Sequence, residues 1–258
     1  MEVQVFQDLE TLSIRAAEFF VETSNNYISS KGKFAAAVSG GSTPVRLFAL
    51  LGSGLFRDKV DWHDVHIFMV DERFVPSSHK DSNYRILHEN LLSKIPIPGD
   101  NVHPVKTDEP SPQISAKKYE EEMRKFFGLS KGSLPEFDII FLGIGEDGHT
   151  ASLFPGSNVL EEKERLAVPV MTGEMGHYRI TLTLPVINNA ENVIFLVGGR
   201  DKAEVLKKVL EDREPSLPAC RVEPKKGKLF YLLDKAAGSH LSKRFICPNN
   251  ADIVQKFI

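Results

Sequence analysis

The stretch FDIIFLGIGEDGHT, residues 137–150, decides the fold expected for this chain of 258 residues. Its first part, Phe137 to Leu142, is an almost continuously apolar run, as expected for a strand buried on both faces of a parallel sheet. Three further runs have the same character, at residues 34–38 (FAAAV), 66–70 (HIFMV) and 193–197 (VIFLV). Because such strands alternate with helical segments, the sequence predicts an α/β fold with a mostly parallel sheet covered by helices on both faces.

The segments between these runs complete the expected order of elements. Helices are expected at about residues 44–51, 81–92, 114–127 and 202–210. Shorter strands are expected at residues 167–170, 179–184 and 229–233. The run at 179–184 (RITLTL) alternates polar and apolar residues, which indicates an edge or antiparallel strand. Residues 96–112 hold five prolines and read as a loop. No repeat or long linker divides the chain, so we expect one domain over residues 1–258.

Composition excludes several classes of protein. With 32 basic and 35 acidic side chains the formal charge is −3, which argues against a dedicated nucleic-acid binder. The 41% of hydrophobic residues suffice for a large core, yet no apolar run approaches the roughly 18 residues of a membrane span. Only Cys220 and Cys247 are present, and the first residues lack a signal-peptide pattern. We therefore expect a cytoplasmic protein, whose oligomeric state the sequence leaves open.

Glycines, hydroxyls and charges follow four of the expected strands. Ligands of open α/β sheets bind beyond the carboxyl ends of the strands, so these four segments are expected to meet on one rim. They are Ser39–Thr43, Asp71–Arg73, Gly145–Thr150 and Gly199–Lys202.

The first of these segments reads as a cradle for a phosphate group. It consists of Ser39, Gly40, Gly41, Ser42 and Thr43, followed by a proline suited to a first helical turn. Glycines let the backbone approach an anion closely, and a helix N-terminus supplies free N–H groups. The segment lacks the GK[ST] ending of a P-loop and the G-x-G-x-x-G of a dinucleotide site. A simple glycine turn with a hydroxyl cap is the alternative.

Three cations stand at strand boundaries on the same rim. Arg73 and Arg179 could bind phosphate or carboxylate through the guanidinium fork, and Lys202 follows a Gly-Gly turn at a helix start. Each alone is most often a solvated surface residue. Together, beside a glycine cradle, they favour an anionic substrate.

The sharpest feature is His149 in the segment GEDGHT. Its imidazole can accept a proton near neutral pH, and either Asp147 or Glu146 could orient it. Most histidines in a chain are structural or exposed, but a position after a buried strand among glycines and acids favours catalysis. No G-x-S-x-G motif indicates a serine hydrolase, and no histidine or cysteine cluster indicates a metal.

A family resemblance appears when these segments are taken in order. SGGSTP, VDERFVPSSHKDSNYR, LGIGEDGHTASLFPG, RITLTLPVINNAENVIFLVGGRDKAEVL and KLFYLLDKAA resemble 6-phosphogluconolactonases over nearly the whole chain. The wider superfamily also holds glucosamine-6-phosphate deaminases, which share the glycine cradle, the acidic pair and the DGH turn. The region before KLFYLLDKAA departs from the lactonase pattern, since Glu223-Pro224-Lys225 replaces the usual proline-histidine pair.

The resemblance implies a Rossmann-like fold and hydrolysis of 6-phospho-D-glucono-1,5-lactone to 6-phosphogluconate, without a metal or organic cofactor. It implies that His149 is the general base, with Asp147 as the favoured orienter. Substrate contacts are expected from the glycine cradle, the three cations and Asp71. Two alternatives remain, a deaminase or isomerase with Asp71 as the C–H base, and a non-enzymatic sugar-phosphate sensor. The deaminase is disfavoured because Arg73 and Phe154 stand where deaminases carry a tyrosine and a glutamate.

Overall fold

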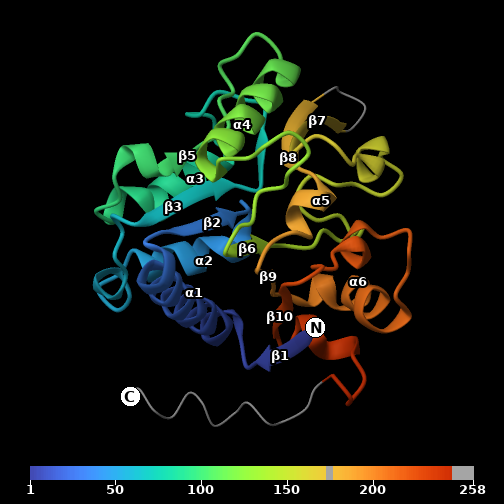
Figure 1. Ribbon diagram of the computed structural model, residues 1–258. Helices are drawn as coiled ribbons and strands as arrows, with labels where there is room; N and C mark the ends of the chain where they lie inside the picture. Colours follow the sequence, from blue (N-terminus) through green and yellow to red (C-terminus); the bar gives the residue numbers. More distant parts are fainter. Residues whose placement is uncertain (173–176, 246–258) are drawn as a thin grey trace.

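Two β-sheets form the centre of the molecule in the computed structural model, which describes residues 1–172 and 177–245 (Figure 1). All neighbours in the larger sheet are parallel, in the order β1 (Glu2–Phe6), β10 (Lys228–Asp234), β9 (Asn192–Val197), β6 (Ile139–Leu142), β2 (Phe34–Val38), β3 (Val65–Met69) and β5 (Val102–His103). The smaller sheet is antiparallel, in the order β4 (Asp71–Arg73), β8 (His177–Leu182) and β7 (Ala167–Thr172). The predicted α/β fold is confirmed, and the RITLTL run is antiparallel, although it is the middle strand.

The α-helices of the described chain are those labelled in Figure 1. They are α1 (Leu9–Lys31), α2 (Ser42–Leu51), α3 (Asn83–Asn90), α4 (Pro112–Phe127), α5 (Leu184–Ile187) and α6 (Ala203–Lys207). None of the helices in the described residues is long and apolar enough to cross a membrane.

Side-chain alternation places helices on both faces of the larger sheet. Phe34 and Phe141 belong to one face, where the ring of Phe20 on α1 contacts both, at 5.2 and 6.4 Å between centroids. Phe68 belongs to the opposite face. It pairs with Ala37, which lies three residues after Phe34 on β2, and successive side chains of a strand point to opposite faces. The rings of Phe126 and Phe127 on α4 contact Phe68 at 5.1 and 5.9 Å. These aromatic contacts fix α1 and α4 on opposite sides of the sheet.

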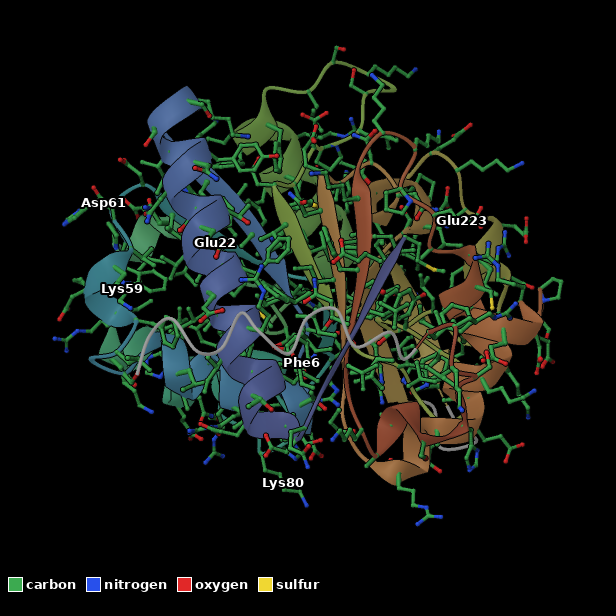
Figure 2. The ribbon with its side chains drawn as sticks, turned by 90° about the horizontal axis from the view of Figure 1, so that it is seen from below. Phe6, Glu22, Lys59, Asp61, Lys80 and Glu223 are labelled. Carbon is green, nitrogen blue, oxygen red and sulfur yellow. The ribbon has the colours of Figure 1, made fainter. Side chains whose placement is uncertain are left out.

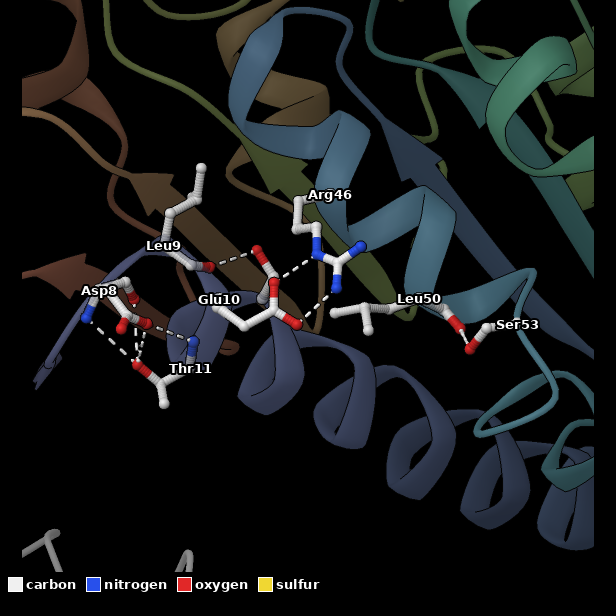
Figure 3. A network of polar contacts seen from close by, with 8 residues as sticks. Asp8, Leu9, Glu10, Thr11, Arg46, Leu50 and Ser53 are labelled. Atoms are coloured by element: carbon white, nitrogen blue, oxygen red, sulfur yellow. Dashed lines mark hydrogen bonds and ion pairs between the residues drawn. The ribbon is translucent and has the colours of Figure 1, made fainter.

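Local sequence explains where the long first helix begins and how it holds its neighbour (Figure 3). The Asp8 carboxylate accepts the backbone N–H of Thr11 at 2.9 Å, and the Thr11 hydroxyl accepts the backbone N–H of Asp8. This reciprocal cap satisfies N–H groups that the first turn leaves free. Two residues further along, Glu10 forms a bidentate ion pair with Arg46 on α2. Away from this contact, charged side chains such as Lys59, Asp61 and Glu223 point outward (Figure 2).

The strand order creates a switch point between β2 and β6. From β2 the chain continues to β3 and β5 on one side, and from β6 it continues to β9 and β10 on the other. Connections leaving two neighbouring strands in opposite directions open a crevice beyond their carboxyl ends. The crevice lies between the Ser39–Thr43 segment, after β2, and the Gly145–Thr150 segment, after β6.

Several expected boundaries were wrong. Residues 71–73 form β4, a strand of the second sheet, rather than a simple strand exit. The strand expected at 179–184 ends at Leu182, because Leu184 and Pro185 open α5. The helix expected at 202–210 is divided into a 3₁₀ turn, α6 and a π-helical turn over Lys208–Asp212. The proline-rich loop contains β5, and Cys247 lies outside the described residues.

Candidate active site

A cavity of about 250 Å³ opens at the switch point. The structure brings to its wall every residue that the sequence assigned to substrate, together with His149. These residues are Ser39, Gly40, Gly41, Ser42, Thr43, Asp71, Arg73, Arg179 and Lys202. Asp147 stands behind His149 instead of on the wall. The cavity therefore combines a candidate base, a glycine turn and three cations.

The glycine cradle presents the start of α2 to the cavity. Gly41 precedes the helix at φ +106°, a conformation that favours glycine, and no side chain of the described residues caps the N–H groups of the first turn. Ser39 is buried, and its hydroxyl donates to the carbonyl of Phe141 at 2.9 Å. Ser39 thus ties β2 to β6, while the first turn of α2 offers N–H groups at the positive end of the helix dipole, an arrangement that suits an anion.

The second sheet sets the two arginines side by side. Arg73 on β4 is directly opposite Arg179 on β8. Burial lowers the pKa of the Arg179 guanidinium, while Asp71 raises it and Arg73 lowers it further. Like charges placed opposite each other repel. An anion bound between the guanidiniums would relieve this repulsion.

A buried polar network fixes Asp71 and Arg73. Asn83, the first residue of α3, donates to the Asp71 carbonyl at 2.9 Å and to its carboxylate at 3.2 Å. The Asn83 side-chain oxygen accepts from Arg73 Nη1 at 2.5 Å. Ser152 donates to the other Asp71 oxygen at 2.6 Å. The Asn83 amide fills the space beside Gly40, where a Cβ would lie 1.9 Å from its oxygen.

One Arg73 nitrogen stays unused. Within the described residues, Arg73 Nε is buried and has no hydrogen-bond partner. A buried donor without a partner costs free energy, so the position favours an acceptor supplied from outside the chain.

Glu72 holds this network from behind. Its side chain is buried and accepts the backbone N–H groups of Asn83 and Tyr84, both at 2.7 Å. Burial raises the pKa of the Glu72 carboxyl, although the hydrogen bonds from Tyr84, Asn83 and Arg73 oppose that rise. Glu72 therefore fixes the start of α3 and, with it, the position of Asn83.

Lys202 reaches the cavity from the turn after β9. The turn is held by Asp234, whose carboxylate accepts the N–H of Gly199 at 2.9 Å and that of Ala237 at 2.7 Å. Lys202 Nζ lies 3.1 Å from Asp201 and 3.8 Å from Glu146. Glu146 is thus a partner of Lys202, which leaves the other acid of the GEDGHT segment for the histidine.

His149 is held by Asp147. One Asp147 oxygen lies 2.5 Å from His149 Nδ1 and accepts the backbone N–H of His149 at 3.1 Å. Burial acts to raise the pKa of the Asp147 carboxyl, but these contacts outweigh it and hold the pKa below its usual value. With the Nδ1 proton directed at Asp147, Nε2 is the basic nitrogen, and it has no partner within the described residues.

Gly145 gives the imidazole its place. A Cβ on Gly145 would lie 2.1 Å from Nδ1 and 2.2 Å from Cε1 of His149. Any side chain at this position would push the ring away. The ring also contacts Phe154, with 4.5 Å between centroids.

Sequence reasoning missed Asn83, Ser152 and the contacts of Phe154. Asn83 lies in the quoted SNYR segment and Ser152 and Phe154 in TASLFP, so only the resemblance carried a signal for them. Nothing in their sequence positions distinguishes them from residues that cap helices or fill the core. They reach the site through contacts with the second sheet, since Asn83 and Ser152 bind Asp71 on β4 and Phe154 contacts Arg179 on β8.

Known proteins resemble this chain over more than nine-tenths of its length. Residues 7–231 match the family described as glucosamine-6-phosphate isomerases/6-phosphogluconolactonase. The chain belongs to this family. It is similar to the 6-phosphogluconolactonase of Nostoc sp., at 37% identity over 93% of this chain and 98% of that protein. The rat 6-phosphogluconolactonase is 36% identical over 94% of this chain and 95% of its own.

A solved structure of the glucosamine-6-phosphate isomerase/6-phosphogluconolactonase family extends the likeness to the fold. The 6-phosphogluconolactonase from Trypanosoma cruzi superposes with a TM-score of 0.82 at 30% identity, covering 93% of this chain and 97% of that one. The fold described above is thus shared with that protein over most of both chains.

Proposed function

We propose that this chain is a 6-phosphogluconolactonase that hydrolyses 6-phospho-D-glucono-1,5-lactone to 6-phosphogluconate. The carrying observation is that His149, oriented by Asp147, opens onto the same cavity as the uncapped start of α2 and three cations. A base and cations that line one small cavity suit a substrate that carries both a reactive carbonyl and a phosphate group.

His149 acts first as a base. Its Nε2 takes a proton from a water molecule as the water oxygen attacks C1 of the lactone, and the carbonyl oxygen becomes an oxyanion. Asp147 stabilises the imidazolium that results, because its carboxylate faces Nδ1 at 2.5 Å. The imidazolium then donates its Nε2 proton to the ring oxygen as the bond from C1 to that oxygen breaks. The new carboxylic acid ionises and releases one proton to solvent.

The phosphate anchors the reacting end. The N–H groups of α2, Arg179 and Lys202 form the phosphate side, so binding energy from a group that does not react positions C1 at the base. Arg73 completes the site, and its unpartnered Nε is the donor for substrate oxygen. Asp71 is engaged by Asn83 and Ser152, and its charge favours the charged form of Arg179.

Proton release from freshly prepared lactone tests the proposal. The chain should accelerate proton release from the phosphorylated lactone far above spontaneous opening, and much less from unphosphorylated gluconolactone. Equal rates on the two lactones would contradict the phosphate anchor. Ammonia release from glucosamine 6-phosphate would instead indicate the deaminase reaction, for which Phe154 supplies no carboxylate.

We also propose the cytoplasm as the place of action. Two cysteines in 258 residues offer no disulfide framework, which suits a reducing compartment.

A further inference from the structure

Phe154 contacts both the candidate base and one of the cations of the candidate site. Its ring centroid lies 4.5 Å from that of the His149 imidazole, with 36° between the planes. The Arg179 guanidinium carbon lies 5.5 Å from the same centroid. One half-buried side chain thus contacts both the base and a cation on the phosphate side.

The backbone before Phe154 places the ring there. Leu153 donates its N–H to the carbonyl of Thr150 at 2.9 Å, which closes a tight turn. Within that turn Ala151 has a φ of +53°, a left-handed conformation that non-glycine residues adopt only when their surroundings enforce it. Ser152 anchors the turn from the side, through the Asp71 carboxylate and the Thr181 hydroxyl. The position of Phe154 is therefore determined by the same network that holds Asp71 and Arg73.

We propose that Phe154 is a positioning residue that holds the His149 imidazole and the Arg179 guanidinium in a fixed relation. This inference rests on the proposed function and adds a residue to it. Asp147 and Gly145 restrain His149 from one edge and one side, and the Phe154 ring supplies a further contact. A guanidinium over an aromatic face is attracted by the ring quadrupole, which holds Arg179 while no anion is bound.

The proposal predicts a specific kinetic signature. Phe154→Leu keeps apolar bulk but removes the ring. It should lower kcat about tenfold on both the phosphorylated and the unphosphorylated lactone, because the base loses its alignment. It should raise KM about threefold on the phosphorylated lactone only, because only that substrate uses Arg179. Phe154→Tyr keeps the ring and should restore both constants to within about twofold.

Phe19 offers a matched control. It is also half-buried, its ring lies 4.8 Å from that of Phe230, and Arg15 lies over it at 5.7 Å. Phe19→Leu therefore removes the same kinds of contact from α1, where no site residue is involved. Its kcat and KM should stay at the values of the unaltered chain.

A titration with inorganic phosphate separates this inference from the proposed function. Phe154→Leu should weaken phosphate binding about threefold relative to Phe19→Leu, whether or not the chain hydrolyses a lactone. An inactive unaltered chain would overturn the proposed function, while the titration would still judge the contact with Arg179. If Phe154→Leu has the same phosphate affinity and kinetics as Phe19→Leu, the proposed role of Phe154 is overturned. It is also overturned if Phe154→Tyr fails to restore the affinity and kinetics that Phe154→Leu loses.

Discussion

Two histidine–carboxylate pairs in this molecule differ in what surrounds them. His149 Nδ1 lies 2.5 Å from Asp147, and His103 Nδ1 lies 2.9 Å from Glu122 on α4. In the second pair His103 is buried against the Phe68 ring, 4.0 Å away and nearly parallel, and its Nε2 lies 3.3 Å from His66 Nδ1. Both nitrogens of His103 are therefore engaged, whereas Nε2 of His149 has no partner among residues 1–172 and 177–245.

The contrast shows that a carboxylate partner does not by itself make a histidine a base. A general base needs a free nitrogen within reach of the proton it takes. At His149 the glycine turn leaves that nitrogen open beside three cations. At His103 the same side-chain chemistry links β5, β3 and α4. Burial lowers the pKa of His103, against the opposing effect of Glu122, so this ring is neutral and structural near pH 7.

Exchanging each histidine for glutamine tests the comparison most directly. His149→Gln should lower kcat about 10²–10⁴-fold, because general base catalysis is lost. His103→Gln should leave kcat within about twofold while lowering the unfolding free energy by about 1–3 kcal/mol, since a buried hydrogen-bonded ring is lost. Proton release, corrected for spontaneous opening, and urea unfolding measure the two effects. Equal losses of turnover in both variants would refute the distinction.

The glycine beside His149 should be the next most sensitive position. Gly145→Ala places a Cβ 2.1 Å from His149 Nδ1 and 2.7 Å from the Asp147 carboxylate, so the ring must move. A displacement of about 1 Å at a reacting group can cost on the order of 100-fold in kcat. Gly54→Ala is the control, because a Cβ there meets no atom within 4 Å. Normal turnover in Gly145→Ala would show that the imidazole need not occupy this place.

A smaller effect is expected from the acid that orients the base. Asp147→Asn keeps an oxygen able to accept the Nδ1 proton but loses the charge that stabilises the imidazolium. Turnover should fall about tenfold, as for other groups that orient a functional histidine. The matched change Glu122→Gln, at the second pair, should leave turnover unaltered. The kcat values of both variants, measured on the same lactone, decide the point.

The strand ends were predictable because the chemistry and the topology are both local. A glycine-rich segment directly after a buried strand, such as Ser39–Thr43 or Gly145–Thr150, must emerge on the carboxyl edge of the sheet. The choice between Glu146 and Asp147 could not be made, because it depends on the turn geometry that directs Glu146 toward Lys202. The side chains that support the site depend on tertiary structure in the same way.

The second sheet marks the limit of sequence reasoning. Strand β4 has only three residues, too few for a periodic pattern, and its pairing with β8 is what sets Arg73 opposite Arg179. Strand β5 is also too short for a periodic pattern, and its two residues lie within a proline-rich segment. The 23-residue helix α1 was not among the expected helices. Its run Ser24-Asn25-Asn26 has low helix propensity, which the capping at Asp8 and the packing of Phe20 overcome.

The smallest effect concerns stability in acid. Burial, His103 and Lys33 lower the pKa of His66 to about 4, with Asp64 opposing the shift. The unfolded chain binds this proton near pH 6.5, so stability should fall as the pH drops from about 6.5 to about 4. Since His66 is only partly buried, solvent screens part of this effect, and we expect a loss of about 1–2 kcal/mol. His66→Gln should reduce the difference in unfolding free energy between pH 7 and pH 5, and the exposed His240→Gln should not. If the two variants respond alike to acid, His66 does not contribute to the pH dependence of stability. The histidine pair at His103 would then differ from the pair at His149 in geometry alone.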